Sequence, residues 1–128
     1  MIGENNEDLA TTLAMLLGAE PDMRSVATVA STAAVLAALD QHDANGFVLD
    51  LSLDDGSSLP LIAKLRARIP HAVIIVHTGF QNDSLQEECV RSGADGVVVK
   101  TGDIDTLTAA LRAAAQRRWG AAPCNPGT

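Results

Sequence analysis

Short apolar runs that alternate with helix-like segments constrain the fold of this chain more than any other feature of its sequence. Two runs, residues 72–78 ("AVIIVHT") and 96–100 ("GVVVK"), are almost continuously apolar. A strand is apolar along its whole length where both faces of its sheet are covered, which is typical of parallel sheets. We therefore expect both runs to be strands that are fully buried, with helices packed on each face of the sheet.

Segments with helical periodicity separate these runs along the chain. We expect helices at residues 6–17, 31–41, 58–69, 83–93 and 103–119. Further strands are expected at residues 24–30 and 47–53. The expected helix caps are Ser31, either Ser57 or Ser58, a capping box of Ser84 and Glu87, and Asp103.

The alternation of strands and helices predicts βαβ units with right-handed crossovers. We expect one doubly wound α/β domain of three layers, built on a five-stranded parallel sheet. Its first strand is unusually short, because only residues 1–3 precede the first polar segment. Either this strand is very short, or the chain is a shortened form of a longer one. The domain is expected to span residues 1–119, with 120–128 as a flexible tail or the start of a linker.

Composition and charge exclude several classes of function. The 128 residues are 47% hydrophobic and 20% charged, which suits one globular domain. A formal net charge of −7 repels phosphate backbones, and only 2% of the residues are aromatic, so we expect no direct nucleic-acid binding. The sequence has no apolar run long enough to span a membrane. Cys89 and Cys124 lack metal-ligand spacing, which favours free thiols in a cytoplasmic protein.

Three polar residues stand at the ends of successive expected strands. Asp50 is near the end of one strand, Thr78 closes the next, and Lys100 closes the one after it. In an open parallel sheet these ends meet at one edge, where ligands bind. A buried carboxylate is costly unless it is paired, and the Lys100 ammonium is the expected partner of Asp50.

The chemistry that suits this trio is phosphoryl transfer to a carboxylate. An aspartate can act as a nucleophile and form an aspartyl-phosphate. The phosphoryl oxygens then need donors, which a hydroxyl at Thr78 and a cation at Lys100 would supply. A divalent cation, Mg²⁺ above all, completes such a site with one or two carboxylates.

Nearly the whole chain resembles the receiver domains of two-component response regulators. "VLDLSLDDGSSLPLIAKLR" resembles the phosphoacceptor strand, loop and following helix of that family. "VIIVHTG" resembles its hydroxyl-bearing strand, and "GADGVVVK" its lysine strand. Each motif alone is weak, but the three in this order are specific. In style they are most similar to the receivers of NarL-type transcription factors.

The resemblance implies roles for the three strand-end residues. Asp50 would be the phosphoacceptor, Thr78 the switch hydroxyl and Lys100 the family's lysine. Val97 stands where the family often has an aromatic switch residue, and a valine cannot make an aromatic in-and-out flip. Switching would then run through Thr78 and neighbouring loops.

The resemblance also implies a Mg²⁺ site. The acidic pair that follows the family's first strand, usually Asp-Asp, corresponds to Glu4 and Asn5 here. Asp50 and the backbone carbonyl of Ser52 would complete the ligands. Since an asparagine removes one negative charge, the resemblance implies weaker Mg²⁺ binding than is usual in the family.

Three functions remain open. The leading one is a cytoplasmic receiver, not an enzyme beyond self-phosphorylation and self-dephosphorylation, which accepts a phosphoryl group from a histidine kinase on Asp50. It would form the N-terminal part of a transcriptional regulator and contact a second copy or an output domain through its last two helices. The alternatives are a phosphorylation-independent interaction module and, more remotely, a haloacid-dehalogenase-like phosphatase.

Five further side chains carry expectations of a structural kind. His77 alternates away from Thr78 and is expected at the surface or partly packed. Arg112, Arg117 and Arg118 are expected on a solvated face of the last helix. Trp119 is either an interface anchor or a cap on the core.

Overall fold

The strands of the central sheet are β1 (Ile2–Gly3), β2 (Thr28–Val29), β3 (Gly46–Leu49), β6 (Val73–Thr78) and β7 (Gly96–Val99). The computed structural model describes residues 1–79, 82–101 and 103–120. Neighbouring strands pair in parallel in the order β2-β1-β3-β6-β7. The predicted five-stranded parallel sheet is therefore confirmed.

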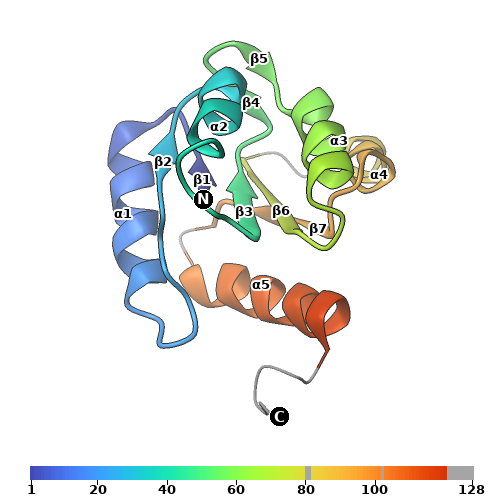
Figure 1. Cartoon of the computed structure of the whole chain (residues 1–128). Helices are drawn as coiled ribbons and strands as arrows, with labels where there is room; N and C mark the ends of the chain where they lie inside the picture. Colours follow the sequence, from blue (N-terminus) through green and yellow to red (C-terminus); the bar gives the residue numbers. More distant parts are fainter. Residues whose placement is uncertain (80–81, 102, 121–128) are drawn as a thin grey trace.

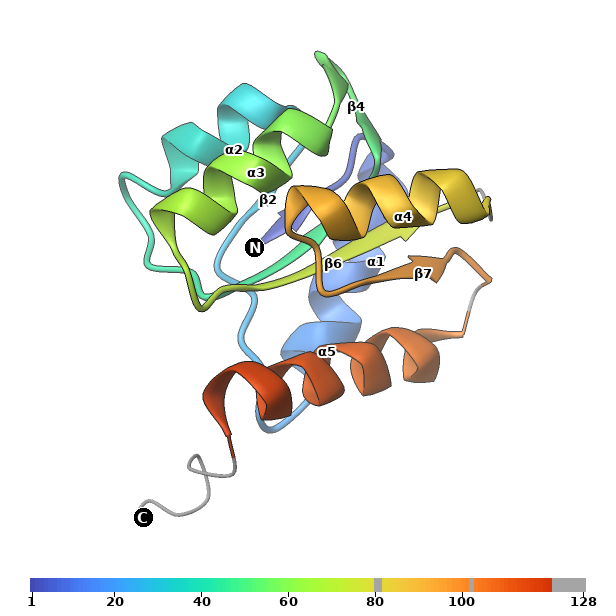
Figure 2. The same cartoon turned by 90° about the vertical axis from the view of Figure 1, so that its right-hand side faces the viewer.

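Helices cover both faces of this sheet. They are α1 (Glu7–Gly18), α2 (Thr32–Ala38), α3 (Leu59–Arg68), α4 (Asp83–Ser92) and α5 (Ile104–Trp119). One apolar core joins α2, α3 and α4 to the sheet, and a second core joins α1 and α5 to its other face. Figures 1 and 2 show the two helical layers on either side of the strands. The doubly wound, three-layer prediction is confirmed.

The first strand is central although it has two residues. Ile2 pairs with Thr28 of β2 and with Val48 of β3, so β1 lies between them. Packing favours glycine at position 3, because a Cβ there would lie 2.9 Å from Leu49 Cδ2 and would force that side chain to shift. The expected strand at residues 24–30 was too long, since only Thr28–Val29 pairs with β1.

The expected strand at residues 47–53 is wrong beyond Leu49. The chain leaves the sheet there and forms a separate antiparallel hairpin of β4 (Ser52–Leu53) and β5 (Gly56–Ser57). Gly56 has a φ of 121°, a value that favours glycine at this turn. The hairpin places Asp50 directly after β3, in a loop, rather than inside a strand.

Several capping predictions are confirmed and one is wrong. Ser31 accepts a hydrogen bond from Ala34 N, and Asp103 accepts one from Asp105 N. The capping box at residues 84–87 does not form, because Asn82 is the cap of α4 and accepts from Leu85 N at 3.2 Å.

At the start of α3, Ser57 supplies the hydrogen bond and Ser58 occupies the cap position. Ser57 Oγ accepts from Leu59 N at 3.2 Å, whereas the buried Ser58 Oγ has no hydrogen-bond partner among the described residues. Sequence could not separate these adjacent serines, because their distinction depends on the hairpin that precedes the helix.

The prediction that residues 96–100 are fully buried is also wrong. Val98 is buried, but Val97 and Val99 are half-buried. The reason is the place of β7 at an edge of the sheet, with a neighbour on one side only.

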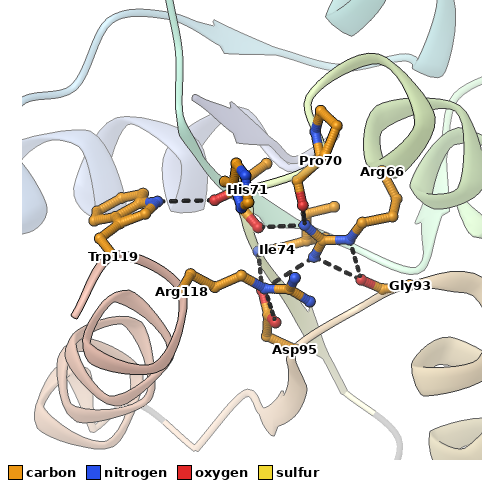
Figure 3. Close-up of polar contacts among 9 residues, drawn as sticks. Arg66, Pro70, His71, Ile74, Gly93, Asp95, Arg118 and Trp119 are labelled. Carbon is orange, nitrogen blue, oxygen red and sulfur yellow. Dashed lines mark hydrogen bonds and ion pairs between the residues drawn. The ribbon is translucent and has the colours of Figure 1, made fainter.

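Polar contacts centred on Asp95 link three elements at the N-terminal edge of the sheet (Figure 3). We call this group, which includes Arg66, Arg118 and Trp119, the clamp. Asp95, just before β7, accepts hydrogen bonds from Ile74 N, from Arg66 of α3 and from Arg118 of α5. Trp119 donates from Nε1 to the carbonyl of His71 at 2.8 Å. The clamp thus ties α3, β6 and the last turn of α5 together.

The expectation of a solvated arginine face on α5 is only partly right. Arg117 and Arg112 are exposed, but Arg112 pairs with Glu20 and Asp22 in the loop after α1, and the half-buried Arg118 pairs with Asp95. Trp119 is held by its hydrogen bond to the His71 carbonyl and remains 37% exposed.

Candidate functional site

Four chemistry-bearing side chains follow or close parallel strands at one edge of the sheet. Glu4 follows β1, Asp50 follows β3, Thr78 closes β6 and Lys100 follows β7. Because the strands are parallel, these ends lie together. Backbone hydrogen bonds hold them in register: Asp50 N donates to Gly3 O at 2.8 Å, and Lys100 N donates to Thr78 O at 2.7 Å.

Lys100 bridges two carboxylates. Its Nζ lies 2.7 Å from Asp50 Oδ2 and 2.8 Å from Glu4 Oε1. The exposed fractions of the three side chains are 23% for Lys100, 13% for Asp50 and 2% for Glu4. Burial opposes the charged form of Lys100, but the hydrogen bonds that its ammonium donates to Asp50 and Glu4 raise its pKa above the usual 10.5. The predicted pairing of Asp50 with Lys100 is confirmed.

Backbone amides hold the remaining carboxylate oxygens. Glu4 Oε2 accepts from Asn6 N at 3.1 Å, at the start of α1. Asp50 Oδ1 accepts a longer bond, 3.3 Å, from Ser52 N. Asp50 therefore has one oxygen held by Lys100 and the other directed at the hairpin.

Thr78 is only 2% exposed and lies beside the site. It lines a small cavity of about 80 Å³ under α4, together with Leu51, Cys89 and Val97. On the side of the sheet, the cavity is bordered by Val97 of β7. The backbone of Thr78 is joined to Lys100, so a movement of either residue affects the other.

The four expected metal ligands differ in their placement. Glu4 and Asp50 converge on one ammonium, whereas Asn5 is exposed and makes no hydrogen bond to another described residue. Ser52 is exposed and reaches Asp50 through its amide. Among the described residues, no group of three His, Cys, Asp or Glu side chains is suited to hold a metal ion. Two carboxylates at one point match the donor set that Mg²⁺ prefers when phosphate oxygens supply the rest.

His77 does not lie at the surface, so that part of its prediction is wrong. It is 7% exposed, and its Nδ1 has no hydrogen-bond partner among the described residues. Burial, followed by the charge of Lys100, lowers its pKa below the usual 6.5. The apolar run "AVIIVHT" already carried this signal, since a strand buried on two faces buries every residue in it.

Sequence reasoning missed the role of Asp55 in the hairpin that follows Asp50. Asp55, in the hairpin turn, accepts hydrogen bonds from the backbone and hydroxyl of Thr32 and from Ala33 N, at the start of α2. These bonds lower its pKa to about 2. Asp55 therefore caps a helix that is distant in the sequence and holds the loop that follows Asp50.

Residues 1–112 match the response regulator receiver domain. Over 97 residues the chain is 30% identical to the DNA-binding transcriptional activator DevR/DosR of Mycobacterium tuberculosis, covering 76% of this chain and 45% of that protein. Over 102 residues it is 33% identical to the transcriptional regulatory protein UhpA of Salmonella typhimurium, covering 80% of this chain and 50% of that protein. The chain thus spans about half the length of these relatives.

A solved structure agrees with these relatives. A response regulator protein from Burkholderia pseudomallei, determined with a phosphorylated aspartic acid, a calcium ion and citrate, superposes with a TM-score of 0.79 at 28% identity. The likeness covers 98% of this chain and 73% of that one. No helix in residues 1–79, 82–101 and 103–120 is long and apolar enough to cross a membrane. The sequence match, the sheet order and the ordered strand-end residues agree, and the chain belongs to the family of response regulator receiver domains.

Proposed function

We propose that this receiver accepts a phosphoryl group on Asp50 from the phosphohistidine of a kinase and thereby changes its protein contacts. One observation carries the proposal: the Lys100 ammonium lies 2.7 Å from Asp50 at the carboxyl edge of the sheet. An ammonium there can pair with the carboxylate before transfer and with a phosphoryl oxygen after it.

The transfer itself needs few groups. An oxygen of Asp50 attacks phosphorus, the new O–P bond forms, and the bond from phosphorus to the kinase's imidazole nitrogen breaks. The electron pair stays on that nitrogen. Oδ1 is the better placed nucleophile, because Oδ2 is held by Lys100 whereas Oδ1 has only a 3.3 Å bond from Ser52 N. The Ser52 amide and Lys100 would then stabilise the phosphoryl oxygens.

Mg²⁺ would supply charge neutralisation for the transferred group. Glu4 and Asp50 are the carboxylates that would hold it, with Asn5 and the backbone carbonyl of Ser52 as the further proposed ligands. Because Lys100 already pairs with both carboxylates and offsets one of their two negative charges, we expect weak Mg²⁺ binding until a phosphoryl group adds negative charge.

The contacts that change are proposed to lie on α4, β7 and α5. Val90 of α4 is 52% exposed, and β7 is an edge strand beside it. Thr78 and its cavity lie directly under α4, so a shift of Thr78 toward a phosphoryl group can reach this face. We propose that the partner there is a second copy or an output domain, in a transcriptional regulator.

Incubation with acetyl phosphate and Mg²⁺ tests the proposal. Intact-protein mass spectrometry should find one added phosphoryl group in the wild type and none in Asp50→Asn. The matched control is Asp54→Asn, which changes an exposed carboxylate in the adjacent hairpin and should phosphorylate normally.

Two results would redirect the assignment. A protein that never gains a phosphoryl group, and shows no Mg²⁺-dependent change with beryllofluoride, would be a phosphorylation-independent interaction module. Repeated turnover of p-nitrophenyl phosphate would indicate a phosphatase instead.

A further inference from the structure

The cavity of about 80 Å³ under α4 lies between one face of this helix and the end of the sheet. Its helical wall is formed by positions 82, 85, 86 and 89, which share a face because they recur at helical spacing. Its sheet wall is formed by Val97 and Val99, alternate residues of β7, with Thr78 of β6 beside them. Leu51, in the loop after β3, completes the described lining. Figure 2 shows α4 alongside β6 and β7.

The side chains on the sheet side are too small to close this space. Val97 and Val99 are half-buried and belong to a strand at the edge of the sheet. Atoms that border a void lose dispersion contacts that a close-packed interior would supply. An occupant of the right shape restores those contacts.

The lining carries no charge. None of the described residues that line the cavity is Asp, Glu, Lys or Arg, although 20% of the chain is charged. Burial, followed by the charge of Glu88, raises the pKa of the Cys89 thiol, so this side chain is neutral at pH 7 as well. An ion that entered would lose its hydration without gaining a partner. The cavity therefore selects a neutral ligand.

The lining is apolar inside and polar at its mouth. Cys89 is only 1% exposed and lies with the valines of β7 in the inner part. Asn82 and Gln86 are exposed and place neutral amides at the opening. An amide exchanges hydrogen bonds with a hydroxyl, whereas the inner wall offers water few polar partners. These features together favour an amphiphile with an alkyl body and one neutral polar group.

Volume limits the ligand to a few atoms. A cavity of about 150 Å³ holds benzene, so in proportion a cavity of about 80 Å³ holds roughly three or four non-hydrogen atoms. A short aliphatic alcohol has this size and this division of polarity.

We propose that the cavity under α4 binds a small neutral alcohol, with its alkyl part against Val97 and Val99 and its hydroxyl toward the amides of Asn82 and Gln86. The occupant fills the space beneath α4 and holds this helix against the sheet. The Kd lies in the millimolar range, because so few atoms make contact.

Titration of the full 128-residue chain with 2-propanol, followed by NMR, tests the site. Methyl resonances of Leu51, Leu85, Val97 and Val99 should shift and saturate. Acetate is the matched control, since it has as many non-hydrogen atoms but carries a charge. It should bind at least about tenfold more weakly than the alcohol.

Two variants of β7 provide a second comparison. Val97→Ile adds a methylene to the wall of the cavity, whereas Val98→Ile adds one on the other side of the sheet. The affinity for 2-propanol should fall at least about threefold in the first and stay within about twofold of the wild type in the second.

Cys89 provides a chemical readout, because it lines the cavity and is almost wholly buried. In a chain with Cys124→Ser it is the one remaining thiol. Iodoacetamide must enter the same space to reach it. At about ten times its Kd, 2-propanol should therefore slow this alkylation about tenfold, since only the unoccupied protein reacts. Acetate at the same concentration should leave the rate within about twofold of that without additive.

Three results of the titration would overturn the site: shifts that stay linear up to about 100 mM alcohol, far above the millimolar range; acetate binding as tight as that of 2-propanol; or saturable shifts only at residues away from α4 and β7. Unchanged alkylation of Cys89 at saturating alcohol would also overturn it. The comparison of alcohol with acetate needs no variant, so a failure of Val97→Ile to fold leaves the test intact. Phosphorylation of Asp50 is not involved, so the site and the proposed function fail independently.

Discussion

Lys100 is the residue on which the charge balance of the site depends. It is the partner of both Asp50 and Glu4, and Glu4 is almost wholly buried. Removing the shared cation leaves two carboxylates close together without compensation, whereas removing one carboxylate leaves the cation with a partner. The loss of stability should therefore be larger when the cation is removed than when one carboxylate is removed.

We predict that Lys100→Met lowers the free energy of unfolding by about 2–3 kcal/mol at pH 7, because it leaves buried charge unpaired. Asp50→Asn, with Glu4 still bound to the lysine, should cost about 1 kcal/mol or less. Urea denaturation measures both. Equal losses in the two variants would contradict the shared-cation account.

Asp55 predicts a pH dependence at low pH. Its pKa in the folded protein is about 2, below the usual 3.8, so its contribution to stability is fully present above pH 3.8. That contribution is lost as the pH falls through about 2. We expect Asp55→Asn to be less stable than the wild type at pH 7, with the difference shrinking between pH 4 and pH 2.

Carboxyl NMR of Asp55 provides a direct check. Its titration midpoint should lie near 2 in the folded protein. A midpoint near 3.8 would show that the bonds to Thr32 and Ala33 do not persist in solution.

At the scale of elements, α4 and α5 are held differently. The last turn of α5 is fixed by the clamp around Asp95 (Figure 3). The sheet side of α4, in contrast, borders the 80 Å³ cavity. We therefore expect α4 to shift more readily than the end of α5.

We expect Val97→Ile to stabilise the protein by about 1 kcal/mol, because the added methylene enters the cavity under α4. The control is Val98→Ile one residue on, which faces the closely packed core on the other side of the sheet. That change should be neutral or destabilising, since cores without space tolerate added methylenes poorly. Thermal unfolding measures the stability of both variants. A more stable Val98→Ile than Val97→Ile would show that the cavity under α4 does not accept the added methylene.

For the clamp, we predict that Asp95→Ala costs about 3 kcal/mol, because Arg66 and Arg118 lose their shared carboxylate and Ile74 N loses its acceptor. Trp119 fluorescence should shift to the red as the end of α5 loosens. Asp54→Ala, an exposed matched change, should lie within about 0.5 kcal/mol of the wild type. A small effect of Asp95→Ala on both stability and fluorescence would refute the clamp.

The whole molecule carries a formal net charge of −7, which bears on its partners. At this scale we expect no measurable affinity for duplex DNA at physiological salt, because the summed field repels phosphates. Fluorescence anisotropy with labelled DNA measures this. Saturable binding that weakens with salt would mean that a local basic surface outweighs the net charge.

Periodicity alone was enough to predict the order of strands and helices, the parallel sheet with two covered faces, and the shared edge of Asp50, Thr78 and Lys100. These features follow from local patterns, since a run such as "VIIVHT" is apolar on both faces. The end of β3 at Leu49 and the hairpin after it were not predictable in this way. They depend on Asp55 reaching the start of α2.

Tertiary structure decided the contacts between segments that are distant in the chain. It brought Glu4 to Lys100, buried His77 and joined Arg118 to Asp95. Local periodicity specifies which face of an element is apolar, but not which polar side chains come into contact across the sheet. Those contacts are set by strand register and helix packing, which only the folded chain determines.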